Sequence, residues 1–224
     1  MEKNGGKVMR SATLRGLLMH SAYEAGANPG PDYRFGWGLA NADSGAKVID
    51  NSSGEHRILE TMLEDGDSIV LEVTAKGGGI PLKTSISWTD PAHEVLPPSV
   101  DNLTPMLVND LDLRIKRNSS VFFPWTLDPT NPTAAADSTQ DNAVDNYERV
   151  IVRNPPAGNQ YKIIIKHKGT LSPGHQRVSV IISGIDQAPQ NSFLEQETTL
   201  TENPDSSPDS GDCRSYQVVN IPLA

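Results

Sequence analysis

The sequence predicts an antiparallel β-sandwich or jelly roll, preceded by a small helical segment. From about residue 54 onward, apolar and polar residues alternate with a period of two in seven or eight short runs. Gly, Pro and Asn clusters separate these runs, and the 18 Gly and 17 Pro of the 224 residues follow no fixed period. Short strands without intervening helices are typical of two packed antiparallel sheets.

Before residue 54 the spacing is helical. Residues 11–22 predict a short helix with Ser11 as its N-cap, and its repeating face consists of Leu14, Leu17, Leu18 and Ser21. Asn41 is expected to cap a second helix over 42–49. Two short helices with no sheet of their own cannot form a core, so we expect them to need a partner that this chain does not fully supply.

The strands are predicted from the alternating runs. Their ranges are 57–63, 69–73, 82–88, 110–115, 121–125, 147–152, 161–167 and 177–183. The turn at 64–67 favours a hairpin between the first two. In the third run we expect Leu82, Thr84, Ile86 and Trp88 to face the core, with Lys83, Ser85, Ser87 and Thr89 on the opposite face.

Composition divides the chain and excludes some partners. Three parts are expected: 1–50, a sandwich over 54–185, and an acidic Pro/Ser-rich linker with an undetermined segment over 186–224. The net charge of −9, without a basic stripe, argues against nucleic acid as a partner. Cys213 is the sole cysteine, so neither an intrachain disulfide nor a thiolate zinc cluster is expected. No signal peptide or membrane span is expected.

Two stretches of residues 1–50 resemble the C-terminal end of a subtilase catalytic domain. These are Ala12-Thr13-Leu14-Arg15-Gly16-Leu17-Leu18-Met19-His20-Ser21-Ala22 and Pro31-Asp32-Tyr33-Arg34-Phe35-Gly36-Trp37-Gly38-Leu39-Ala40-Asn41-Ala42. In that family the first corresponds to a helix that follows the serine-bearing helix, and the second to an aromatic-glycine turn that opens the closing helix. We expect its glycines to lie where the backbone folds back on itself and a Cβ would clash.

The remainder resembles the jelly-roll domain that some bacterial subtilases carry behind the protease, distantly like the P domain of proprotein convertases. The landmarks, in order, are Ser87-Trp88-Thr89-Asp90, Leu107-Val108-Asn109-Asp110-Leu111-Asp112-Leu113, Asp145-Asn146-Tyr147-Glu148-Arg149-Val150 and Gln176-Arg177-Val178-Ser179-Val180-Ile181-Ile182-Ser183-Gly184. Together the two resemblances cover roughly residues 8–185.

The resemblance implies a secreted serine endopeptidase as the parent protein, with an upstream catalytic domain as partner and proteins or peptides as substrates. A secreted protein without a signal peptide is expected to be a fragment. Subtilase chemistry needs a serine on a Gly-Thr-Ser turn, with Asp and His beside it. Here Gly169-Thr170 is followed by Leu171, so no catalytic residue is assigned and the chain is expected to be inactive alone.

Other functions stay open. The chain could instead be an independent calcium-dependent or carbohydrate-binding module, or, less favoured, a separate hydrolase. Trp88, Trp125, Phe122 and Phe123 could stack on sugars, although Trp88 shares a face with core residues. The five histidines have no metal or catalytic spacing and are expected to be surface or strand residues. The triplets at Asp43 and Asp209 are not expected to be catalytic, because neither follows a buried strand.

The acidic residues suggest a cation site. Asp110 and Asp112 lie two apart on one strand, so both project from the face opposite Leu111 and Leu113. Asp141 and Asp145 belong to the acidic loop before the strand at 147–152. Carboxylates without His or Cys suit Ca²⁺, and related jelly rolls bind it, so these four residues are the predicted ligands. Alternatively, Asp and Asn simply form turns here, and no loop has EF-hand spacing.

Overall fold

The computed structural model describes residues 8–51, 53–100, 103–186 and the backbone of 193–195. It is mainly β, as predicted. The elements are helices α1 (Ser11–Ser21) and α2 (Ala42–Asp50), and strands β1 (His56–Glu64), β2 (Ile69–Thr74), β3 (Leu82–Trp88), β4 (Asp110–Arg117), β5 (Ser120–Phe122), β6 (Tyr147–Val152), β7 (Gln160–Lys168), β8 (His175–Ser183) and β9 (Phe193–Glu195).

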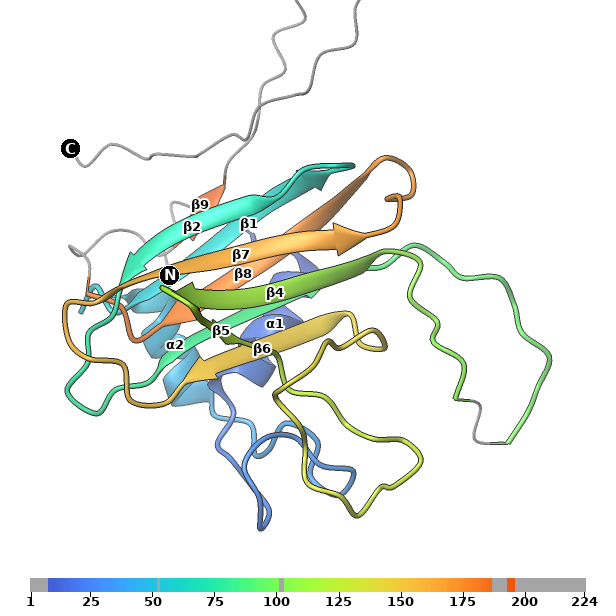
Figure 1. Ribbon diagram of the computed structural model, residues 1–224, viewed down its shortest axis with the longest axis horizontal. Coiled ribbons are helices and arrows are strands. Elements are labelled where there is room, and N and C mark those ends of the chain that lie inside the picture. The colour runs from blue at the N-terminus through green and yellow to red at the C-terminus, as the bar shows by residue number, and fades with distance from the viewer. Residues whose placement is uncertain (1–7, 52, 101–102, 187–192, 196–224) are drawn as a thin grey trace, which may run out of the picture.

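These strands form two sheets. One has the order β6-β3-β8-β1-β9 and the other β2-β7-β4-β5, antiparallel throughout except that β9 runs parallel to β1. Figure 1 shows the sheets as two stacked layers, with α1 and α2 behind the five-stranded sheet. The predicted β-sandwich with a small helical part is therefore confirmed.

The main core lies between the sheets. The predicted alternation is confirmed there: Leu82, Ile86 and Trp88 from β3 are fully buried, as are Leu111 and Leu113 from β4. Burying apolar surface on both inner faces is the main stabilising contribution to such a fold. The one polar atom of the Trp88 side chain has a hydrogen-bond partner, because Nε1 donates to the carbonyl of Asn109 at 3.1 Å.

The predicted hairpin between β1 and β2 is wrong. A turn does form, since the amide of Asp67 donates to the carbonyl of Glu64 at 3.1 Å. However, β1 pairs with β8 and β9, whereas β2 pairs with β7. The turn joins the two sheets rather than two neighbours in one sheet. Alternation identifies each strand's buried face but carries no information on which strand lies beside it.

Both predicted helices form, with one correction. Asn41 caps α2, because its Oδ1 accepts from the amide of Ser44 at 3.0 Å. Ser11 does not cap α1; the N-cap is Arg10, without a side-chain cap. The buried face of α1 is also rotated from the predicted one, so that Leu14 and Leu18 are 53% and 51% exposed.

The aromatic-glycine turn folds tightly, although the expected clash of a Cβ is found at Gly38 and not at Gly36, which has open space around it. Tyr23 and Leu39 exchange two backbone hydrogen bonds of 2.9 Å, and Gly38 (φ +106°) has no room for a Cβ beside the carbonyl of Tyr23. Trp37 then packs edge-on against Tyr147, with ring centroids 4.9 Å apart. This turn is thereby attached to the edge of the five-stranded sheet.

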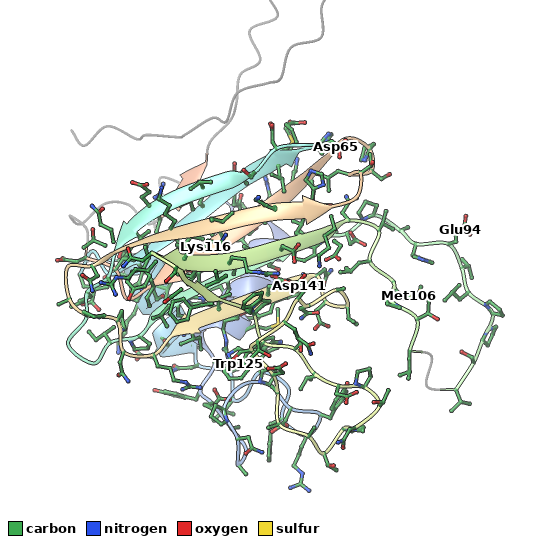
Figure 2. The ribbon with its side chains drawn as sticks, viewed as in Figure 1. Asp65, Glu94, Met106, Lys116, Trp125 and Asp141 are labelled. Atoms are coloured by element: carbon green, nitrogen blue, oxygen red, sulfur yellow. The ribbon has the colours of Figure 1, made fainter. Side chains whose placement is uncertain are left out.

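Two long loops leave the sandwich. The loop between β3 and β4 stands off from the body, as the positions of Glu94 and Met106 show (Figure 2). The loop between β5 and β6 carries Trp125, which lies against Gly30. The predicted strand at 121–125 is shorter and ends at Phe122. The predicted linker falls largely outside the described residues.

Candidate functional site

The outward face of the five-stranded sheet is polar and lies under α1. Strand register places three rows of side chains across it. The rows are Tyr147-Ser87-Ser179-Glu60, Arg149-Ser85-Ile181-Ile58 and Ile151-Lys83-Ser183-His56. Small hydroxyl side chains allow a close approach here: a Cβ on Gly16 would lie 2.9 Å from the Cβ of Ser87. The face that alternation marks as polar is therefore covered.

The N-terminal half of α1 is held by charged hydrogen bonds. The buried Glu60 carboxylate accepts from the amide of Arg10 at 2.9 Å and from the hydroxyl of Thr13. Thr13 also contacts the Ser179 hydroxyl at 2.8 Å. The negative Glu60 carboxylate thus lies against the N-terminal end of α1, where a negative charge is favourable.

Arg15 ties the middle of α1 to the end of β3. Its guanidinium donates to Ser87 Oγ at 3.0 Å, to the carbonyl of Trp88 at 2.8 Å, and to both oxygens of Asn146 at 2.7 and 2.8 Å. One side chain therefore joins α1, β3 and the loop before β6. A planar guanidinium with five donors suits this role.

The C-terminal half of α1 inserts His20, which is fully buried. Its Nδ1 is 2.8 Å from Ser85 Oγ, and its Nε2 is 2.8 Å from Ser183 Oγ. Ser183 also contacts His56 Nδ1 at 2.9 Å. These Ser–His pairs resemble part of a hydrolase site, but the helix covers them and a substrate carbonyl cannot reach Ser85. The prediction that histidines lie on the surface or on strands is wrong for His20.

Positive groups surround this histidine. Burial, followed by Arg149, lowers the pKa of Lys83 to about 8, and the Lys83 ammonium donates to the carbonyl of His20 at 2.5 Å. Burial raises the pKa of Tyr147 to about 12, so it stays a neutral phenol that contacts Ser85 at 2.9 Å. The interface combines this network with a small apolar cluster of Leu17, Val48, Ile58 and Ile181.

On the other sheet, the structure brings three of the four predicted metal ligands together. Lys168 Nζ is 3.3 Å from Asp110, 3.1 Å from Asp112 and 3.2 Å from Asp141. Arg114 also pairs with Asp112 and Asp141. Two cationic side chains of the chain itself therefore occupy the position predicted for a cation.

Glu148 adds a fourth carboxylate, fully buried beside this group. Strand β5 covers the edge of β4 only at Ile115–Arg117, so the amide of Leu113 lacks a strand partner on that side and donates to Glu148 Oε2 at 2.6 Å. Burial raises the pKa of Glu148 well above its usual range. Glu148 Oε1 and Asp110 Oδ1 are buried and have no hydrogen-bond partner among the described residues.

Asp145 is engaged differently. Its Oδ2 accepts from Asn142 Nδ2 at 2.8 Å, which is the turn-forming alternative. Within the described residues, no group of three or more His, Cys, Asp or Glu side chains is arranged to hold a metal ion. Calcium therefore stays a prediction, with Asp110, Asp112 and Asp141 as its converging carboxylates.

An open cleft of about 460 Å³ lies beside the N-terminus of α1, lined by residues that include Arg10, Asp90, His175 and Arg177. Arg10 is paired with Glu60, and Asp90 accepts from the amides of Val108 and Asn109 at 2.6 and 2.9 Å. Because Arg10 and Asp90 both bind other groups of the protein, we assign no ligand to this cleft.

Comparisons with known proteins leave the family open. No family model matches the chain, and no curated protein matches it significantly. In the part of the chain that the structure describes, neither helix has the length and apolar character needed to cross a membrane. The resemblance to subtilases therefore stays a prediction.

Sequence reasoning missed the interface roles of His20 and Lys83 and the burial of Glu148. A signal for the first two was present, because β3 and β8 carry small hydroxyl residues at alternate positions, and such a face accepts a closely packed helix. Glu148 gave no such signal, since its role depends on how far β5 covers β4.

Proposed function

We propose that this chain is the non-catalytic C-terminal part of a secreted subtilisin-like serine endopeptidase. In this proposal α1 and α2 belong to the end of the protease fold and attach the sandwich to the upstream catalytic domain. The sandwich stabilises the protease, and substrates are bound and cleaved by the catalytic domain alone.

The two-sided character of α1 is the observation that supports this proposal most. One face is fixed to the sandwich through Thr13, Arg15, Leu17 and His20, while the opposite face leaves Leu14 and Leu18 half exposed. A helix with a second apolar face is typical of one buried between two bodies. Tyr23 and Leu39, 62% and 68% exposed, add apolar surface nearby in sequence.

The test has two stages. The coding sequence in frame upstream of Met1 should contain a Gly-Thr-Ser-Met-Ala-like segment. The catalytic domain found there should associate with this chain in analytical ultracentrifugation, and Leu14→Asp with Leu18→Asp should weaken association at least tenfold. Val95→Asp, at an exposed position of the β3–β4 loop, is the matched control and should change nothing. An upstream sequence without that segment, or association insensitive to the α1 variants, would refute the proposal.

A calcium-dependent binding module is the second candidate. The observation that favours it is the pair of unpartnered carboxylate oxygens on Asp110 and Glu148, because a buried anionic oxygen without a donor is costly. The sugar-stacking alternative has less support, since Trp88 is fully buried and Phe123 packs on Arg114 at 4.7 Å.

A further inference from the structure

One fully buried imidazole lies in the contact between α1 and the sheet. His20 bridges Ser85 on β3 and Ser183 on β8, with 2.8 Å from each ring nitrogen to a hydroxyl. A neutral imidazole offers one donor and one acceptor, and two hydroxyls can satisfy both. The neutral ring therefore fits this position without an unsatisfied atom.

The charged groups around His20 are mainly positive. Lys83 faces it from β3, Arg149 from β6 and His56 from β1. The carboxylates that act on these neighbouring groups are paired elsewhere: Glu24, which acts on Lys83, lies 3.9 Å from Arg149, and Glu55, which acts on His56, pairs with Lys76. A second proton on His20 would place a positive charge in a buried site beside two cations, with no anion paired to it.

We propose that α1 is a pH-sensitive clasp, which lies on the five-stranded sheet at neutral pH and separates from it as His20 becomes protonated in mild acid. This inference does not rest on the proposed protease origin, because every group in it belongs to this chain.

The direction of the pH effect follows from the charge. Burial, and then Lys83, Arg149 and His56, lower the pKa of His20 well below its ordinary 6.5. The docked state keeps its full stability above pH 6.5 and loses it as pH falls below that value, because the released histidine binds the proton more tightly. His56 is shifted in the same direction, mainly by burial. Lys83, with a pKa of about 8, changes charge in the mildly alkaline range and is already charged in mild acid.

Separation of α1 leaves the sandwich intact. The contacts of α1 are largely polar, and its apolar cluster is distinct from the main core between the sheets. The face it uncovers carries Ser85, Ser87, Ser179 and Ser183, which water can solvate. Local opening of such a unit takes less free energy than global unfolding.

Hydrogen exchange of the whole chain at pH 7.5 and pH 5.0, corrected for intrinsic exchange rates, tests the clasp. For one proton taken up on opening, the opening constant of residues 11–21 should rise by up to about 30-fold at pH 5.0. Strand β7, which opens only with the sandwich core, should have a smaller opening constant than residues 11–21 at both pH values. His20→Gln should remove most of the difference between the two pH values, with any remainder attributable to His56, and His93→Gln, in the exposed β3–β4 loop, should preserve it.

Direct titration of the His20 ring by NMR is the second measurement. It uses the native chain, so it tests the clasp even if His20→Gln releases α1 at every pH. A ring that stays neutral to well below pH 6.5 while α1 is docked supports the clasp. Equal protection of α1 at both pH values, or a His20 that titrates near 6.5 with α1 still protected, would overturn it.

Discussion

Single buried polar residues decide how the elements of this protein fit together. His20 joins α1 to two strands, Glu60 receives the start of the same helix, and Glu148 satisfies an amide that β5 leaves uncovered. A buried polar group stabilises a fold only when its partners are in place, so each of these residues specifies one arrangement.

Glu148 gives a test at this scale. Its folded-state pKa is raised above the ordinary 4.5, so the unfolded chain releases its proton first and stability is lost as pH rises above 4.5. Glu148→Gln keeps an acceptor for Leu113 and does not titrate. In EDTA it should raise the free energy of unfolding by on the order of 1 kcal/mol at pH 7.5 and have no such advantage at pH 4.

Urea unfolding at the two pH values measures this difference. Glu72→Gln is the control, because Glu72 is exposed and pairs with Lys162 on the surface at 3.2 Å; its effect should stay within about 0.5 kcal/mol. A Glu148→Gln protein less stable than the native one at pH 7.5 would mean that the ionised carboxylate contributes to the fold.

At the scale of elements, the position of α1 depends on close contact with β3. Gly16→Val should destabilise its docking, because the added side chain meets the Cβ of Ser87, which is fixed to the backbone of β3. We expect a loss of about 1–3 kcal/mol and a lower melting temperature in calorimetry. Leu14→Val, at an exposed position of the same helix, should cost under about 1 kcal/mol. Equal effects would mean that α1 does not pack closely on the sheet.

The strand β4 and the loop before β6 carry the calcium prediction. Millimolar Ca²⁺ should raise the melting temperature by several degrees relative to EDTA, since a ligand at a hundredfold excess over its Kd adds about 2.7 kcal/mol. Mg²⁺ should substitute poorly, because it prefers tight octahedral geometry. Asp112→Ala should abolish the shift, and Asp43→Ala, on the exposed face of α2, should not. An unchanged melting temperature would identify Lys168 and Arg114 as the only cations of this group.

At the scale of the whole molecule, the sandwich provides a body to which other parts attach. The core between the sheets is continuous, and the helices, the aromatic-glycine turn and the long loops lie around it (Figure 1). The contacts of His20 with Ser85 and Ser183 lie beneath α1, so this Ser–His pair is not accessible for acyl transfer.

The purified chain should therefore neither hydrolyse casein nor react with a fluorophosphonate probe, because no Gly-Thr-Ser turn presents a serine. Mass spectrometry after incubation with the probe is the measurement, with an active subtilisin as the positive control. Specific labelling of Ser183 or any other serine would show that this chain is a hydrolase in its own right.

The sequence by itself determined the strands β1 to β8, the buried faces of β3 and β4 and the cap of α2, because these depend on periodicity and on side chains within one turn. It did not predict β9, which lies in the segment expected to be a linker. Only the tertiary structure decided which strands pair, since two-residue alternation is the same for every neighbour. It also decided that the polar face of β3 and β8 is covered, and that His20 and Glu148 are buried. Those outcomes depend on which surfaces meet across 35 positions of chain, as between Leu113 and Glu148, or 65, as between His20 and Ser85, where local spacing carries no information.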